Sequence, residues 1–437
     1  MKKTLIALSL ILSLTAVNAQ PKSAADAQKA VAKAESAAAD AKKAEKPATW
    51  IDLAKAYVNA YDQPGRNILT GTPQQEIKLF LKEQRVLGTS EKTGAEGIYT
   101  VDSYEDKDLY YNANGILEFF LVTKPAVEGD LLGKAIDALQ KAKAVDPKDT
   151  KAKDINTLAE DIHGKLANEA LSEYLAGNFS KASALFKKAA DCAQSPLLNK
   201  VDSLNVYYTA LVSNMAGDQN QAITYYKKCI DMGYYQDGNA FSNLAEVYRK
   251  AGDNEACKAT LEQGFVKFPE NNGILIGLIN LYIDNQEDTA KLFELLHSAQ
   301  AIDPKNASLY YVEGNVHKQL GDFENAARLY VKSSEIDPNY VFGTLGLGVL
   351  YYDQAIELQT KASEELDDSK YYALVQELDA TLEKAIDPFE KAFSATQDNE
   401  LKAAVAEYLK NIYFRLRDKN PSYEGLSKKY ESFLKGE

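Results

Sequence analysis

Prolines recur along this chain at a nearly constant interval, and each closes a stretch of helical pattern. Pro304 lies 35 residues after Pro269, and Pro338 lies 34 residues after Pro304. A proline cannot continue a helix, so each one ends a helix and opens the next unit. A period of about 34 residues is typical of helix pairs that bury a continuous core only by stacking on one another.

The segment 307–340 shows the pattern of one helix pair most clearly. Its apolar spacing predicts helices at about 308–320 and 324–336, joined by a short turn. Gly314 and Ala326 fall on the facing sides of these two helices. Their small side chains would let the two backbones approach closely.

The residues of this segment resemble the tetratricopeptide repeat. The matching positions are Tyr310, Gly314, Ala326, Tyr330, Ser333 and Pro338. The same frame fits further segments, at 163–196, 203–236, 238–271 and, less regularly, 273–306. The resemblance implies an all-α fold, a right-handed superhelix of about eight helix pairs. The layout is similar to that of exported tetratricopeptide proteins of Bacteroidota.

An insert at 62–130 interrupts the first repeat, which spans 47–147. After a turn at Pro64, the pattern predicts a short helix at 74–86. Apolar and polar alternation then predicts strands at 98–104, 109–111 and 116–123. The aromatic residues expected to pack this small sheet against the helices are Tyr99, Tyr110, Tyr111, Phe119 and Phe120.

The remaining segments complete the expected organisation. The central array of repeats is expected at 163–340. Charged helical sequence separates the two halves of the repeat at 341–400, so both of its helices should be elongated. The polar last helix of 401–437 suits a capping repeat. Residues 20–46 are rich in alanine and lysine without a large apolar face, and we interpret them as a helical spacer.

The first 19 residues have the parts of a secretory signal peptide. Lys2 and Lys3 precede the apolar stretch 5–14, and small residues before Gln20 suit cleavage after Ala19. The apolar stretch is too short to span a bilayer, and no later stretch is long enough. No cysteine stands at the cleavage site, so a lipid anchor is not expected. We expect a protein exported to the periplasm, which could lie against the outer membrane.

Composition and motifs argue against several classes of function. The formal charge of −13 disfavours nucleic acid as a partner, because an acidic surface repels phosphates. None of the three histidines has metal-ligand spacing, and no catalytic motif is present. We therefore expect no enzyme activity, catalytic residue, metal or cofactor. The three cysteines are expected to be buried apolar side chains, with a Cys229–Cys257 disulfide as the alternative.

The tetratricopeptide resemblance implies a concave groove, lined by the first helix of each pair, that holds a peptide or helix of a partner protein. The residues expected to face this groove are Tyr207, Leu211, Ser242, Glu246, Arg249, Tyr311, Asn315, Lys318, Phe342 and Tyr352. The alternative is that several of them only pack on neighbouring helices. Tyr311 stands where clamps for acidic C-termini have lysine, so an apolar or aromatic-rich peptide is expected.

These expectations together predict a scaffold or adaptor that binds other proteins. A glycan-binding accessory protein of the cell envelope is the alternative, because helical-repeat proteins of sugar uptake exist. The absence of an anchor cysteine and the single tryptophan argue against it. An enzyme with its site in the insert is a third and weaker alternative.

Overall fold

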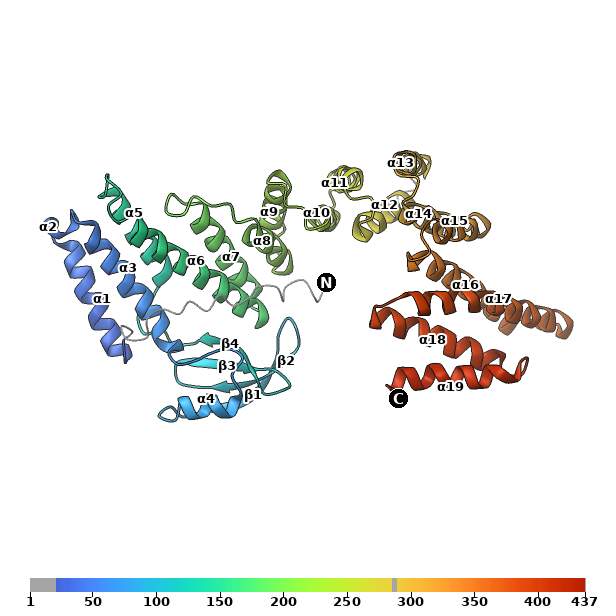
Figure 1. Ribbon diagram of the computed structural model, residues 1–437, viewed down its shortest axis with the longest axis horizontal. Helices are drawn as coiled ribbons and strands as arrows, with labels where there is room; N and C mark the ends of the chain where they lie inside the picture. The colour runs from blue at the N-terminus through green and yellow to red at the C-terminus, as the bar shows by residue number, and fades with distance from the viewer. Residues whose placement is uncertain (1–20, 285–288, 437) are drawn as a thin grey trace. The chain divides into compact units, whose positions relative to one another are not determined.

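The computed structural model describes residues 21–284 and 289–436 of the chain (Figure 1). The predicted signal peptide lies outside the described residues. Helices and one small antiparallel sheet make up the structure, so the prediction of an all-α array with a β insert is confirmed. Within each compact unit, neighbouring helices bury apolar faces against one another, as a repeat fold requires.

The chain forms two compact units. The N-terminal unit contains the residues up to 236 together with 246–253. The C-terminal unit contains 237–245 and the residues from 254 onward. Helix α10 (Asn239–Lys250) has residues in both units.

The helices of the N-terminal unit pack in pairs, one of which is separated in sequence by the insert. In chain order these helices are α1 (Ala24–Ala39), α2 (Ala41–Ala44), α3 (Pro47–Asp62), the 3₁₀ turn η2 (Gln63–Gly65), α4 (Gln74–Phe80), α5 (Leu131–Ala144), α6 (Ala152–Leu175), α7 (Phe179–Gln194), α8 (Ser203–Met215) and α9 (Gln219–Asp231). Helix α3 pairs with α5, α6 with α7, and α8 with α9. The array was expected to begin at His163, but α6 already begins at Ala152, because apolar residues continue upstream with helical spacing.

The helix expected within residues 20–46 is present, but it packs on the first repeat and does not stand apart from it. Helix α1 packs against α3 and buries Ala27 and Val31. The hydroxyl of Tyr57 on α3 donates to Glu35 on α1 at 2.7 Å. Small alanine side chains let α1 lie close to α3, so the helix needs no row of large apolar residues to cover it.

The insert is a meander of four antiparallel strands in the order β1-β2-β3-β4. The strands are β1 (Gly88–Thr93), β2 (Ile98–Ser103), β3 (Lys107–Tyr111) and β4 (Leu117–Val122). The three predicted strands are present, whereas β1 was missed. All residues of β1 are exposed, so its polar sequence lacks the alternation that marks a half-buried strand. Helix α4 ends at Phe80, six residues before the predicted end.

The two faces of the sheet pack in different places, and Figure 1 shows α4 beside it. Tyr99, Tyr110 and Phe119 pack with Leu175 at the end of α6, as predicted. The prediction is wrong for Tyr111, which packs on the opposite face of the sheet. The side chain of Phe120 packs with Tyr111 on that same opposite face. Adjacent residues of a strand point to opposite faces, which separates these neighbouring aromatics.

The β1–β2 turn attaches the sheet to the C-terminal end of α6. The backbone N–H of Ala95 donates to the carbonyl oxygen of Leu175 at 3.0 Å. The hydroxyl of Tyr174 donates to Glu96 at 2.8 Å. A Cβ atom on Gly94 would lie 2.1 Å from the Leu175 oxygen, so only glycine fits at this approach.

The C-terminal unit continues the pattern of helix pairs. After α10 come α11 (Asn254–Lys267), α12 (Asn272–Asp284), α13 (Thr289–Ile302), α14 (Ala307–Gln319), α15 (Phe323–Ile336), α16 (Val341–Glu364), α17 (Asp368–Ala395), α18 (Asn399–Leu416) and α19 (Pro421–Lys435). Helices α16 and α17 have 24 and 28 residues, against 13 and 14 in α14 and α15. This pair is therefore elongated, as the charged sequence predicts.

The ring of Tyr330 joins three helices of the C-terminal unit. Tyr330 lies on α15, and a Cβ atom on Gly314 of α14 would come within 2.8 Å of its ring. A Cβ atom on Gly346 of α16 would come within 2.9 Å of the same ring. The ring thus lies between glycines on two successive first helices. Its hydroxyl donates to Asn315 Oδ1 at 2.7 Å.

Replacing Gly94 with alanine should weaken the attachment of the insert. The added methyl group meets a backbone oxygen that cannot move freely, so we expect a loss of about 1–3 kcal/mol in unfolding free energy. Urea denaturation would measure this change. Gly88→Ala is the matched control, because a Cβ atom there meets nothing within 4 Å. Equal stability of the two variants would contradict the described contact.

Candidate partner-binding site

Aromatic rings gather where α14 meets the beginning of α16. Tyr311 on α14 lies 5.9 Å from Phe342 and 6.0 Å from Tyr340, measured between ring centroids. The rings of Tyr340 and Phe342 are 5.5 Å apart. All three side chains are half-buried, so each ring retains an accessible surface. The predicted site residues Tyr311 and Phe342 are therefore brought together by the fold.

A second group of rings lies where α16 meets α18. Tyr352 on α16 packs edge-on against Tyr408 on α18, with centroids 4.9 Å apart. Tyr408 in turn stacks on the buried ring of Phe389 at 4.8 Å. Tyr352 and Tyr408 are both half-buried. Tyr352 was predicted, whereas Tyr408 was missed because the last repeat offers few landmarks for setting its frame.

Polar side chains of α14 and α16 also contact one another. Lys318 Nζ on α14 contacts Asp353 Oδ2 on α16 at 2.5 Å, which ties two first helices together. Asn315 accepts the hydrogen bond of Tyr330. The predicted residues Asn315 and Lys318 thus lie beside the rings but already have partners inside the protein. We call the set Tyr311, Tyr340, Phe342, Tyr352 and Tyr408 the aromatic face.

Two phenol groups of the aromatic face, those of Tyr340 and Tyr352, stay neutral. Burial raises the pKa of Tyr340 above its ordinary value, and the neighbouring Tyr311 raises it further. Burial likewise raises the pKa of Tyr352. Neutral phenols offer a large apolar ring and one polar tip, a combination suited to peptide contacts.

The other predicted site residues lie outside the aromatic face. Tyr207 on α8 is only 8% exposed and contacts the rings of Tyr208 and Tyr226, so little of its side chain is open to a partner. This burial favours the alternative that Tyr207 only packs against neighbouring side chains. Leu211 on the same helix is half-buried. The tyrosine fell on the buried side because α8 is apolar on more than one face.

The predicted residues of α10 belong to different units. Arg249 pairs with Glu246 through Nε and Nη2, at 2.7 and 2.8 Å, and both side chains are partly or largely accessible. Ser242, in the C-terminal unit, donates to the carbonyl oxygen of Asn239 at 3.2 Å. These three residues remain predictions for partner binding.

The histidines contact carboxylates, and the cysteines are buried in the helical packing. His163, His297 and His317 each lie within 3.0 Å of a carboxylate oxygen. The described part of the chain contains no group of three or more His, Cys, Asp or Glu that could hold a metal ion. All three cysteines are buried, and Cys229 is in no disulfide, so the alternative Cys229–Cys257 bridge is not formed.

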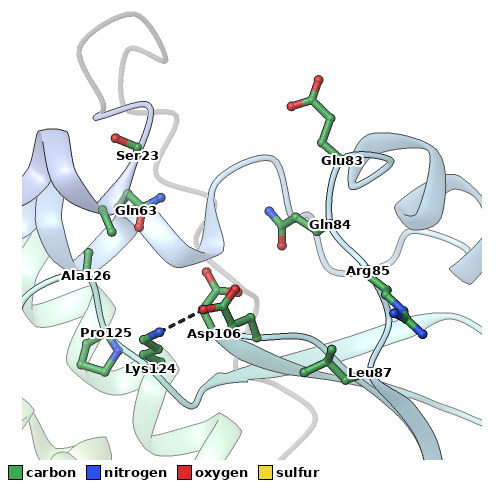
Figure 2. Close-up of a pocket in the computed structure, with 12 residues that line it drawn as sticks. Ser23, Gln63, Glu83, Gln84, Arg85, Leu87, Asp106, Lys124, Pro125 and Ala126 are labelled. Atoms are coloured by element: carbon green, nitrogen blue, oxygen red, sulfur yellow. Dashed lines mark hydrogen bonds and ion pairs between the residues drawn. The ribbon is translucent and has the colours of Figure 1, made fainter.

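A pocket of about 440 Å³ in the N-terminal unit was not predicted (Figure 2). Ser23 before α1, Gln63 after α3, Arg85 before β1 and Lys124 after β4 line part of it. Lys124 forms an ion pair with Glu105 at 3.0 Å, drawn as a dashed line in the figure. The lining residues are far apart in sequence, so no local pattern signals this pocket.

The tetratricopeptide-repeat family model matches residues 307–340. The chain contains a tetratricopeptide repeat. The matched segment is the one whose small and aromatic residues were singled out above, and it contains the contact between Gly314 and Tyr330. No curated protein matches the chain.

The chain is similar to several solved structures, among them two tetratricopeptide proteins of Bacteroidota. One from Parabacteroides merdae covers 56% of this chain and 98% of its own, with 16% identity and a TM-score of 0.32. One from Bacteroides fragilis covers 56% and 97%, with 21% identity and a TM-score of 0.25. A human IFIT1 dimer with m7Gppp-AAAA covers 70% and 64%, with 15% identity and a TM-score of 0.33. Likeness at this level carries no argument about function.

Tetratricopeptide-repeat proteins generally act as scaffolds that bind other proteins or peptides. Within residues 21–284 and 289–436, no helix has both the length and the apolar character that a membrane crossing requires.

The buried cysteines should be unreactive in the folded protein. Burial raises the pKa of the Cys192 thiol to about 11 and that of Cys229 to about 12, so almost no thiolate exists at pH 8. We expect Ellman's reagent at pH 8 to leave both thiols unmodified until urea unfolds the chain. Mass spectrometry of labelled peptides would identify each site. Rapid labelling of either residue before unfolding would contradict the described packing.

Proposed function

We propose that this protein is a non-enzymatic scaffold that binds a peptide or helix of a partner protein on the aromatic face. The observation that carries the proposal is the set of half-buried rings at Tyr311, Tyr340, Phe342, Tyr352 and Tyr408. Tyrosine and related aromatics often supply most of the binding energy in protein interfaces. The tetratricopeptide repeat at 307–340 supports this assignment, because it contains two of these rings, Tyr311 and Tyr340.

The rings are held in place before any partner arrives. Tyr311 touches Tyr330, Tyr340 and Phe342, so its side chain has little rotamer freedom to lose. Side chains that are already ordered bind with a smaller entropic cost. This arrangement favours a partner with apolar or aromatic side chains, which can fill the spaces between the rings.

The charges near the aromatic face argue against an acidic C-terminus as the ligand. Lys318 is the cation closest in sequence to Tyr311 on α14, and Asp353 already neutralises it at 2.5 Å. A ligand carboxylate would have to compete with Asp353 and lose its own hydration. An uncharged or weakly charged peptide avoids both costs.

We also propose that the protein acts in the periplasm. The basic residues Lys2 and Lys3, the apolar stretch 5–14 and the small residues before Gln20 support export with cleavage after Ala19. Mass spectrometry of the protein isolated from its native envelope fraction tests this proposal. A mature chain starting at Gln20 is expected, and recovery of the intact chain in the cytosol would contradict it.

Removing two rings should weaken partner capture. We expect the double substitution Tyr311→Ala with Phe342→Ala to lower the affinity for captured partners at least tenfold, because two anchors are lost. Cross-linking in the native envelope identifies the partner, and isothermal titration calorimetry with that partner gives the affinity. Circular dichroism checks that the helices remain.

Tyr310→Ala is the matched control, because Tyr310 is on α14 but lines a different depression together with Arg328 and Lys332 of α15. This variant should bind the partner as the unsubstituted protein does. Equal losses in both variants would contradict a role specific to the aromatic face. A glycan array serves as a second arm, and glycan binding lost with Tyr311 and Phe342 would favour the sugar-binding alternative.

A further inference from the structure

A second depression of the N-terminal unit, of about 340 Å³, adjoins the pocket in Figure 2. The two share the residues Gln63, Glu83, Gln84 and Asp106. The second depression differs in its charge. Four cations and two carboxylates line it, in a chain whose formal charge is −13.

Lys107 is the buried cation of this depression. It lies on β3 and is only 1% exposed. Its ammonium donates to the carbonyl oxygen of Pro64 at 2.8 Å and to Asp106 Oδ1 at 2.7 Å. An ammonium has three donor hydrogens, so one donor is left without an acceptor among the described residues. A buried charge is stable only when its hydrogen bonds are satisfied.

Arg66 is the second cation with an unused donor. Its Nη1 donates weakly to the carbonyl oxygen of Pro21 at 3.4 Å. Its Nε is buried and has no hydrogen-bond acceptor within the described part of the chain. A buried N–H without an acceptor costs free energy and indicates that an acceptor is missing.

Lys22 and Lys82 complete the cationic rim. Both are exposed, and neither forms an ion pair with a carboxylate of the described residues. Asp106 is already engaged by Lys107, so it cannot neutralise the rim. Glu83 remains as the only other carboxylate among the lining residues of this depression, which leaves a local excess of positive charge.

The wall of the depression also offers apolar surface. Phe80, at the end of α4, is 57% exposed, and Leu81 beside it is buried. The volume falls within the range of pockets that hold small ligands, about 300–1,000 Å³. A ligand could therefore place a charged group near Lys107 and Arg66 and an apolar part against Phe80.

We propose that this depression binds an anionic group, a carboxylate or a phosphate, carried on a small apolar body. Lys107 and Arg66 line the depression and each has an unused donor, and Lys22 and Lys82 attract the anion from solvent. The site belongs to the insert and its surroundings and is independent of the aromatic face. Loss of binding at one site would leave the other intact.

Isothermal titration calorimetry with four probes tests the proposal. The probes are phenyl phosphate, inorganic phosphate, N-acetylphenylalanine and N-acetylphenylalanine amide. We expect at least one of the two aromatic anions to bind saturably and the uncharged amide not to bind. Tighter binding of phenyl phosphate assigns a phosphate ligand, and tighter binding of N-acetylphenylalanine assigns a carboxylate. No saturable binding of any anion would overturn the proposal.

Charge-matched variants separate the site from the overall charge. Lys22→Gln with Lys82→Gln should weaken binding of the anion about tenfold. Lys29→Gln with Lys148→Gln removes the same charge from exposed positions that do not line the depression, and it should leave the affinity unchanged. Equal weakening in both double variants would overturn the proposal.

The substitution Arg66→Met tests whether Arg66 contributes to anion binding or to the stability of the fold. We expect weaker anion binding with an unchanged or raised melting temperature, because the substitution removes a buried donor that lacks an acceptor. A large fall in the melting temperature with unchanged anion affinity would show a structural role instead and would overturn the assignment of Arg66.

Discussion

The repeat depends on an aromatic ring that lies between two glycines. Tyr330 on α15 touches Gly314 on α14 and Gly346 on α16, where any Cβ atom would come within 3 Å of its ring. The close approach fixes the spacing of successive first helices. Helix α15 covers the side of α14 and α16 that carries the glycines. Residues on other sides of α14 and α16 remain accessible. The rings of Tyr311 and Phe342 therefore meet along neighbouring helices.

Much of this architecture could be predicted because the same sequence pattern occurs in several repeats. Small residues, aromatics and a closing proline recur at a fixed period, so an error in one unit is corrected by the others. The proline signal has a limit. Asp337-Pro338 ends α15, whereas Pro388 lies inside α17, where the buried residues Ala385 and Phe389 keep the helix packed. Packing there outweighs the hydrogen bond that proline removes.

The features that escaped prediction come from contacts between distant segments. Strand β1 has no apolar face, and only its pairing with β2 defines it. Tyr207 occupies a groove position in the repeat frame, yet neighbouring tyrosines cover its ring. The cationic depression combines Lys22, Arg66 and Lys107, which no sequence motif connects. The period of a repeat places backbones well, but it does not determine which side chains stay accessible.

The attachment of the insert to α6 gives the sheet a third point of support. Its chain ends already leave from α3 and enter α5, and the Ala95–Leu175 hydrogen bond adds an anchor on the next repeat. Attachment to three helices, α3, α5 and α6, restricts rotation of the sheet about any one connection. The sheet therefore works as a brace between the first and second repeats. A change in the angle between those repeats would strain the sheet itself, and the walls of its depressions would shift with it.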